Sequence, residues 1–475
     1  MSKDWQIENF PDVRNNQLHI DGVSAVELAN AHGTPLFVFS ERRIRHNIDR
    51  LKRAGQVIDR PLKLCYAAKA MSTIGILRAV KDADCDIEVN SGGELYKALE
   101  AGFRGDQIIF NGTSKEIWEL EGAIDAEIYA IQVDSVVELA MIEETAKRLS
   151  KRANVSLRLV PEIESATHHG LQTALLTSKF GMMPDEALEC FRQYKDSPHI
   201  DLAGIHLHIG SQNPSPGAYA EALEVLFVNL HKIYNETGLA LSHINLGGGF
   251  PVNYVANDEV ANSFTDDRRE MLSADFEPKD AIGNAWQTMR RAAESANAAH
   301  LLENITLLLE PGRSIIADAG VLLTSVRNIK QRPIARTEEC DNRPLTTDHW
   351  LLTDAGFNLT LSMVTYNWYY HLVSASRAGE EHDFAYKLAG PLCDGGDVYF
   401  DIEGSGRLPS HRRLPRGVEL GEILALLNCG AYTLSQASQY NSRALPAVIL
   451  VRTNGEPELI RRRDELKDLL LNEIY

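Results

Sequence analysis

The chain lacks the features that mark several classes of protein. Its 475 residues contain no apolar stretch near the roughly 18 residues that a membrane span needs, so none is predicted. The segment Met1–Glu8 has no apolar core of a secretory signal. The six cysteines form no CxxC pair and no metal-ligand spacing, which favours a reducing, cytoplasmic compartment and argues against a zinc site.

An excess of positive charge is also missing. The 48 lysines and arginines are outnumbered by 66 aspartates and glutamates, which gives a net charge of −18. This balance argues against a surface for nucleic acid or for anionic membranes. With 44% hydrophobic and 24% charged residues, the composition is that of a soluble globular protein. The length favours two domains over one.

The first part of the chain, from about residue 36 to 315, alternates short apolar runs with amphipathic segments. Apolar residues three and four apart predict helices over 92–102, 114–125, 135–152 and 217–236. The apolar runs predict strands at 36–39, 108–110, 130–133, 155–159, 202–208, 243–246 and 306–309. Repeated strand–helix alternation predicts an α/β fold with a parallel (β/α)8 barrel, whose chemistry lies on loops after the strands.

The second part has a different texture. Short β-rich runs are predicted at 320–326, 349–353, 384–389, 396–401, 422–426 and 446–452, and the turns between them hold Gly, Pro, Asn and Asp. The pattern predicts a mostly antiparallel β domain. We therefore expect a barrel over 41–315, and a β domain formed by 1–40 and 316–475. The polar stretch 251–300, with one helix near 283–299, is interpreted as an insertion on the barrel.

Lys69 is the most informative residue of the chain. It ends the apolar run Leu64–Ala68, where an ammonium group would be out of place unless it is paired. Covalent attachment to an aldehyde would remove that conflict. The alternative is a surface lysine just past a strand, and Lys69 by itself does not exclude it.

Three other segments carry candidate chemistry at predicted strand ends. Gly247, Gly248 and Gly249 expose backbone amides that can approach a phosphate, although a flexible turn explains three glycines equally well. Glu310 and Arg313 could pair with each other, or serve a ring nitrogen and an anion. His206 and His208 share one strand face by their spacing, but no third ligand accompanies them, so no metal is predicted.

Two loops of the β domain complete the set. The stretch Gly390–Asp397 places Cys393 and Asp394 on a loop flanked by glycine and proline, which is typical of a shaped surface turn. The stretch Asn428–Tyr432 places Tyr432 in another loop. Neither segment indicates a function by itself.

Together these segments resemble the fold-type III pyridoxal phosphate decarboxylases, the group of diaminopimelate, ornithine and arginine decarboxylases. The resemblance spans most of the chain. Its motifs occur in the family's order: Tyr66–Lys69, Ser178–Gly181, His206–Gln212, Gly247–Gly249, Glu310–Arg313, Cys393–Asp397 and Gly430–Tyr432.

The resemblance implies a role for each matching residue and a pyridoxal 5'-phosphate cofactor. Lys69 would hold the cofactor covalently, His208 would stack on its ring and Glu310 would meet its ring nitrogen. Phosphate or substrate-carboxylate contacts are implied for Ser211, Gly247, Gly248, Gly249, Gly312, Arg313 and Tyr432. Cys393 and Asp394 resemble residues that a second subunit inserts into the active site, so a homodimer with shared sites is implied. Tyr366 is expected to contact the substrate, as are Arg313, Asp394 and Tyr432.

The implied reaction assigns tasks to these groups. The ring of the cofactor accepts the electron pair that decarboxylation leaves on the α-carbon, provided that its nitrogen stays protonated. An anionic Glu310 would favour that protonated nitrogen. Cys393 is the candidate donor of the proton that the α-carbon then needs, because a thiol is largely protonated at neutral pH.

The substrate is indicated by two departures from the diaminopimelate pattern. Those enzymes carry an arginine that grips a substrate carboxylate, and Ser362 stands at that position here. A serine cannot replace a bidentate cation. Cys393-Asp394-Gly395 resembles the ornithine decarboxylase version of the loop, in which the aspartate receives a distal ammonium.

Further stretches resemble the D-ornithine/D-lysine decarboxylases, whose products are putrescine and cadaverine. They are Arg104–Gly112, Glu164–His168, Ala389–Asp397, Gly430–Thr433 and Tyr440–Asn441. We therefore expect decarboxylation of D-ornithine or D-lysine. The alternatives are meso-diaminopimelate decarboxylation to L-lysine, decarboxylation of a modified amino acid in natural-product assembly, and a non-catalytic homologue that only binds cofactor or a partner enzyme.

Overall fold

The computed structural model describes residues 5–7, 10–160, 178–255, 258–333 and 347–474. The stretch Glu164–His168 and Cys340 lie outside these residues. The chain divides into two compact units. One consists of Met1–Arg43, Asn253–Ser273 and Ile316–Tyr475, and we call it the β unit. The other consists of Ile44–Val252 and Ala274–Ile315, and we call it the barrel unit.

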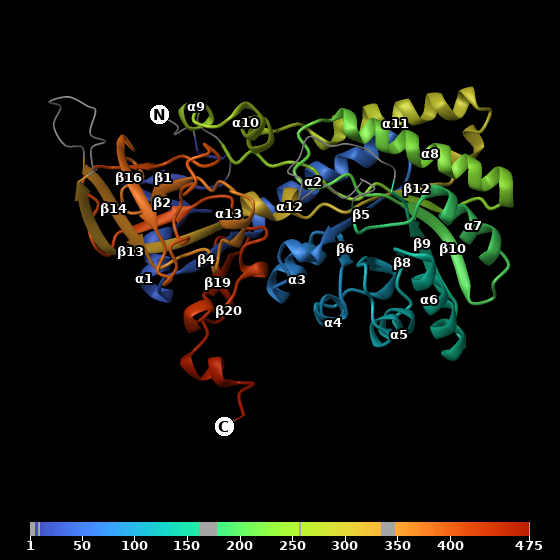
Figure 1. Ribbon diagram of the computed structural model, residues 1–475, viewed down its shortest axis with the longest axis horizontal. Coiled ribbons are helices and arrows are strands. Elements are labelled where there is room, and N and C mark those ends of the chain that lie inside the picture. Colours follow the sequence, from blue (N-terminus) through green and yellow to red (C-terminus); the bar gives the residue numbers. More distant parts are fainter. Residues whose placement is uncertain (1–4, 8–9, 161–177, 256–257, 334–346, 475) are drawn as a thin grey trace. The chain divides into compact units, whose positions relative to one another are not determined.

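The barrel unit is built on a closed barrel of parallel strands, as the alternation predicts (Figure 1). Its strands follow each other around the barrel in chain order, and pairing of β12 with β5 closes the ring. The strands are β5 (Leu62–Ala67), β6 (Asp86–Val89), β7 (Ile108–Phe110), β8 (Ala130–Val133), β9 (Ala153–Arg158), β10 (Ile200–His206), β11 (His243–Asn245) and β12 (Thr306–Leu309).

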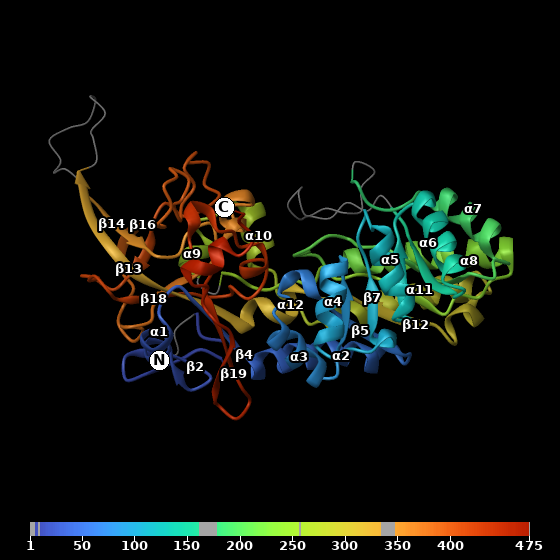
Figure 2. The same ribbon diagram turned by 90° about the horizontal axis from the view of Figure 1, so that it is seen from below.

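Helices alternate with these strands and cover the outside of the barrel (Figure 2). Serine side chains at Ser91 and Ser135 accept hydrogen bonds from backbone amides of the first turn and so fix where α4 and α6 begin. The helices are α2 (Glu41–Ile58), α3 (Ile74–Asp82), α4 (Gly92–Glu100), α5 (Ile117–Asp125), α6 (Val136–Arg148), α7 (Pro184–Tyr194), α8 (Gly217–Thr237), α11 (Pro278–Ser295) and the short α12 (Arg313–Ile316).

Two expectations about this part of the chain need correction. Strand β10 ends at His206, so His208 lies in the loop beyond it and the two histidines do not share a strand face. The stretch interpreted as a barrel insertion is divided: α9 (Asp258–Ala261) and α10 (Asp266–Ser273) belong to the β unit, whereas α11 packs beside α8 in the barrel unit.

The β unit contains a mixed sheet whose central strand is long. Strand β13 (Gly320–Pro333) pairs with β4 (Leu36–Ser40), β14 (Thr347–Thr353) and β18 (Ile423–Leu426). The sheet also contains β15 (Leu372–Ser374), β16 (Phe384–Ala389), β17 (Arg412–Leu414), β19 (Ala447–Val451) and β20 (Pro457–Arg461). A small separate sheet holds β1 (Asp12–Arg14), β2 (Gln17–Ile20) and β3 (Val23–Ser24), followed by α1 (Ala25–His32); α13 (Leu361–Thr365) lies after β14.

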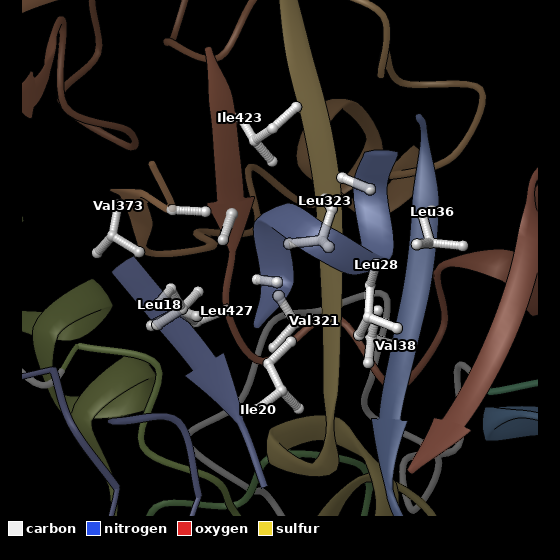
Figure 3. Packing of buried hydrophobic residues seen from close by; sticks show 14 of the residues in the cluster. Leu18, Ile20, Leu28, Leu36, Val38, Val321, Leu323, Val373, Ile423 and Leu427 are labelled. Carbon is white, nitrogen blue, oxygen red and sulfur yellow. The ribbon is translucent and has the colours of Figure 1, made fainter. Parts of the chain in front are cut away.

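The core of the β unit joins these two sheets (Figure 3). Leu18 and Ile20 from the small sheet lie close to Val321 and Leu323 of β13, and Leu28 of α1 packs in the same cluster. All of them are at most 4% exposed. Alternate residues of β13 therefore contribute to this core, while the residues between them are buried as well, so both faces of this part of the strand are covered.

The predicted strand at 396–401 is wrong. Asp397 is buried there, and its carboxylate accepts hydrogen bonds from the backbone amides of Phe357 and Leu392, both at 2.8 Å. A side chain that bonds the backbone in this way favours a turn over a strand. Asp397 thus anchors the loop that follows β16.

Within the described residues, no helix is long and apolar enough to cross a membrane.

Candidate functional site

Lys69 lies directly beyond the end of β5, in a single 3-10 turn formed by Ala68–Ala70. Its ammonium nitrogen is 3.6 Å from Oε1 of Glu88 and 3.4 Å from Oδ1 of Asn90. Glu88 is on the neighbouring strand β6 and is fully buried. The lysine is therefore held at the carboxyl ends of two adjacent barrel strands, where barrel enzymes place their chemistry.

The side chain of Lys69 is 42% exposed, so the expectation of an amine in an apolar setting is not met. The apolar run before it is buried, but the chain turns at Ala68 and the lysine lies beyond the end of the strand. Its distinguishing feature is the carboxylate beside it. A fully buried Glu88 next to a half-exposed amine keeps a cationic group in one place.

Glu310 forms the centre of a buried network. It follows β12, and its carboxylate oxygens accept hydrogen bonds from two side-chain amides: Asn245 at 2.6 Å and Asn111 at 3.0 Å. The same amide nitrogen of Asn111 also donates to Glu88 at 2.9 Å. Asn111 thus bridges two carboxylates that would otherwise repel each other. Nε2 of His206 lies 3.7 Å from Oε2 of Glu310.

Burial, and then the negative charge of Glu88, raises the pKa of Glu310 to about 7. Lys69 and the two amide hydrogen bonds act in the opposite direction. Burial also lowers the pKa of His206 far below its ordinary range, so this histidine is neutral and does not neutralise the carboxylates. A cation beside Glu310 would favour the ionised form of its carboxyl group.

The three glycines form a tight turn after β11, packed against neighbouring backbone. A Cβ on Gly248 would lie 2.4 Å from the carbonyl oxygen of Glu310, and one on Gly249 would lie 2.5 Å from that of Gly210. The amide of Gly248 donates to Nδ1 of His208 at 3.1 Å, so that nitrogen is an acceptor. Burial lowers the pKa of His208 well below its ordinary value. Only glycine fits at these positions.

Arg313 contacts the loop that follows β10. Its Nε donates to the hydroxyl of Ser211 at 3.3 Å, while Glu310 bonds Asn111 and Asn245. Gly312 packs against the strand that carries the lysine: a Cβ there would lie 3.1 Å from the side chains of Ala67 and Ala70. The barrel unit thus brings together Lys69, His208, Ser211, Glu310 and Arg313, together with the three glycines of the turn.

Cys393 and Asp394 lie in the β unit, on the loop that Asp397 anchors. Cys393 is exposed, and its backbone amide donates to Asn441 at 2.7 Å. One carboxylate oxygen of Asp394 accepts from the amide of Gly396 at 2.8 Å, and the other lies 3.4 Å from the hydroxyl of Tyr440. The loop presents a thiol and a carboxylate at its surface in a fixed conformation.

Ser362 and Tyr432 are neighbours in the same unit. The Ser362 hydroxyl is buried and lies 3.4 Å from the carbonyl oxygen of Tyr432 and 3.3 Å from Oε1 of Gln436. Tyr432 has a left-handed backbone, with φ of 55°. The carbonyl oxygen of Tyr366, at the end of α13, accepts from Arg268 at 3.3 Å.

Sequence reasoning missed four buried polar residues around Glu310: Glu88, Asn111, Asn245 and Arg158. Each lies in or directly after a buried strand. A charged or amide side chain in such a run is unusual, and this feature of the sequence could have marked the four residues as functional candidates. Arg158 is 7% exposed and 4.0 Å from Asp134. Among the described residues, no three His, Cys, Asp or Glu side chains form a group that could hold a metal ion.

The geometry of the barrel mouth indicates the class of protein to which the chain belongs. A lysine amine, a buried carboxylate and a glycine turn lie together at the mouth of a parallel barrel. These groups fit an aldehyde cofactor that carries a phosphate and a ring nitrogen. In support, one oxygen of Glu88 and the hydroxyl of Ser314 are buried without a hydrogen-bond partner among the described residues. Such groups are expected to gain partners when a ligand binds.

Comparisons with known proteins identify the family. The pyridoxal binding domain of pyridoxal-dependent decarboxylases matches residues 42–317. The diaminopimelate decarboxylase of Methanocaldococcus jannaschii is 32% identical over 98% of this chain and 96% of its own length. That of Methanothermobacter thermautotrophicus is 33% identical over 97% of both chains. The crystal structure of the Methanocaldococcus jannaschii diaminopimelate decarboxylase aligns with a TM-score of 0.81 at 30% identity, covering 98% of both chains.

The chain therefore belongs to the pyridoxal-dependent decarboxylase family and is a pyridoxal phosphate-dependent amino acid decarboxylase. The expected family, fold and cofactor are confirmed. The comparisons give no support to the D-ornithine/D-lysine subgroup, because these relatives are diaminopimelate decarboxylases. Their names favour the alternative that the sequence left open, meso-diaminopimelate, over the expected substrate.

Proposed function

We propose that Lys69 binds the cofactor covalently and that Glu310 faces its ring nitrogen. Support comes from the position of the amine beside Glu88, at the same barrel mouth as the carboxylate that Asn111 and Asn245 hold. When bound, pyridoxal phosphate accepts the electron pair that remains on the α-carbon as carbon dioxide leaves. Glu310 would keep the ring nitrogen protonated, since its charged form is favoured by a cation alongside it.

The remaining contacts follow from the same loops. The turn of Gly247–Gly249 and the pair of Ser211 and Arg313 lie at strand ends and carry amides, a hydroxyl and a guanidinium, which are the groups that bind phosphate. His208 is oriented through its Nδ1 by Gly248 and would pack against the ring. These residues bind and orient. They do not transfer the proton to the product.

For the substrate, we propose an amino acid whose far end carries an amine without a second carboxylate, D-ornithine or D-lysine. The observation that carries this is Ser362, which is buried and bonded within its own unit where diaminopimelate decarboxylases are expected to place an arginine. A neutral hydroxyl cannot hold a carboxylate as a guanidinium does. The exposed carboxylate of Asp394 suits a distal ammonium. The D configuration comes from the resemblance alone.

The second candidate substrate is meso-diaminopimelate, which the names of the similar proteins favour. It also has a distal ammonium, so Asp394 suits both candidates. They differ in one carboxylate. A single assay separates them: the cofactor-loaded protein is offered D- and L-ornithine, D- and L-lysine and meso-diaminopimelate, and carbon dioxide release is measured. Release from meso-diaminopimelate alone would overturn the main proposal in favour of the second.

Two variants sharpen that assay. Asp394→Asn should lower kcat/KM for the diamino acid by about ten- to a hundredfold, the usual worth of a charged hydrogen bond. Asp12→Asn, which changes an exposed carboxylate of the small sheet, is the matched control. Ser362→Arg should reduce activity on ornithine or lysine and should not reduce it on meso-diaminopimelate. Unchanged selectivity in Ser362→Arg would remove Ser362 from the substrate argument.

We also propose a homodimer in which one subunit supplies Cys393 and Asp394 to the site of its partner. The proposal is supported by the resemblance and by the exposure of Cys393 on a loop fixed through Asp397. In this arrangement the Cys393 thiol would deliver the proton to the α-carbon after carbon dioxide leaves.

A further inference from the structure

The β unit contains a cavity of about 780 Å³ that the decarboxylation chemistry does not use. Its walls come from residues in and beside β15, β16 and β17, together with Trp5 and the end of α9. This volume lies within the range of small-molecule sites. Tyr369, His371 and Arg412 form one part of the lining, and the exposed Glu381 and Asp383 form another.

Arg412 is the unusual member of this lining. It is only 4% exposed, yet only its Nη1 has a hydrogen-bond acceptor, the carbonyl oxygen of Pro409 at 3.1 Å. Its Nε and Nη2 are buried and have no acceptor among the residues that the structure describes. The guanidinium stacks over Tyr369, with 4.8 Å between its carbon and the ring centre. A buried cation with unmet donors is costly unless an anion joins it.

Two other arginines of the same unit have the kind of carboxylate partner that Arg412 lacks among the described residues. Arg43 pairs with Asp318 at 2.6 Å, and Arg377 pairs with Glu422 at 3.0 Å. Arg412 has no carboxylate partner within the described part of the chain, and burial lowers the pKa of its guanidinium. The fold therefore supplies carboxylates to less buried arginines and none to this one.

The groups around Arg412 do not replace an anion. Nδ1 of His371 lies 3.0 Å from the Tyr369 hydroxyl, and burial lowers the pKa of this histidine to about 3. His382 accepts a hydrogen bond from the amide of Ser374 at 3.0 Å. The carboxylate of Asp401 caps its own turn by bonding the amides of Glu403 and Ser405. None of these groups neutralises the guanidinium.

We propose that this cavity binds a small molecule through a carboxylate or phosphate group that pairs with Arg412. The planar fork of a guanidinium matches both groups, and stacking on Tyr369 holds its plane in one orientation. Glu381 and Asp383 border the same cavity and are exposed, so a cationic group on the ligand would suit that side. A small zwitterion meets both requirements.

The test uses the cofactor-loaded full chain and three probes: acetate, inorganic phosphate and glycine betaine, which has no free amine to react with the cofactor. Because Trp5 lines the cavity, binding should change tryptophan fluorescence without changing the absorbance of the cofactor. The change should be lost in Trp5→Phe. Acetate or betaine binding identifies a carboxylate site, and phosphate binding identifies a phosphate site.

Substitutions then assign the binding to Arg412. Arg412→Gln should weaken the affinity by at least about tenfold, and Arg412→Lys by less, because it keeps the charge and loses the fork. If Arg412→Gln does not fold, Arg412→Lys carries the test. The control is Arg416→Gln, an exposed arginine that stacks on Phe384 at 4.4 Å and does not line the cavity. Absence of binding by all three probes, or equal affinity in the Arg412 variants, would overturn the proposal.

Discussion

The side-chain amide of Asn111 donates to Oε2 of Glu310 at 3.0 Å, and this bond couples two carboxylates of the barrel. The same nitrogen donates to Glu88, which lies beside Lys69. The neutral amide of Asn111 therefore bridges two buried carboxyl groups beside Lys69. Removal of the Asn111 amide should affect the charge of Glu310 more than the stability of the barrel.

Asn111→Leu is expected to lower kcat by roughly tenfold or more, since a hydrogen bond to a charged group is worth about 1.5–3 kcal/mol. The pKa of Glu310 should rise further when a donor is lost. We therefore expect the acid limb of the kcat profile to move to higher pH, a change that a purely structural role would not cause. Asn229→Leu, which removes a buried amide of α8 that bonds Val225, is the matched control. An unshifted profile would contradict the assignment.

The stability of the cofactor-free protein should depend on Glu310 in a defined direction. Its folded pKa of about 7 is above that of an unfolded glutamate, near 4.3. The folded state therefore binds this proton more tightly than the unfolded state. The contribution of Glu310 to stability is complete below about pH 4 and is lost as the pH rises through about 7.

Urea unfolding of wild type and Glu310→Gln from pH 4 to 8 checks this prediction. The free energy of unfolding of wild type should fall relative to the variant as the pH rises, with a slope of at most about 1.4 kcal/mol per pH unit. Added cofactor should reduce the difference if its ring nitrogen supplies a cation. A wild-type free energy of unfolding that rises relative to the variant as the pH rises would show that burial does not raise the pKa of Glu310.

Cys393→Ala should leave cofactor binding unchanged, because the loop is fixed through Asp397 and the Cys393 backbone rather than through the thiol. Turnover should fall or divert to transamination, because the α-carbon loses its proton donor. Product analysis and the cofactor absorbance band provide the measurements. Cys190→Ala, at a buried cysteine of α7, controls for loss of a thiol. Equal rate and equal product ratio in Cys393→Ala would remove this residue from the mechanism.

Mixing two inactive variants tests whether the sites are shared. Lys69→Ala should lose covalent cofactor binding and Cys393→Ala should lose turnover. In a randomly reassembled dimer, half of the molecules are heterodimers with one complete site, so about a quarter of wild-type activity should return. Lys97→Ala, an exposed lysine of α4, mixed with Cys393→Ala should give half of wild-type activity with or without exchange, and so controls for an effect of mixing itself. No recovery after proven exchange would mean that each site is built from one chain.

Much of this protein is determined by its sequence alone. The alternation of apolar runs and amphipathic segments predicts a parallel barrel, because strands buried on both faces need helices to cover them. The strand ends place Lys69, Gly247–Gly249 and Glu310 at one rim, since parallel strands end on the same side. The resemblance to the decarboxylase family then supplies the chemistry of these positions.

The tertiary structure decided what the pattern could not. Asn111, Asn245 and Glu88 converge on Lys69 and Glu310 because closure of the barrel pairs β12 with β5, and no local pattern encodes that contact. The exposure of Lys69, the turn around Asp397 and the buried Arg412, which lacks a carboxylate partner among the described residues, are also three-dimensional facts. A linear pattern reports which residues are apolar. It does not report which distant polar groups lie together in the buried interior. Their proximity there determines their protonation states.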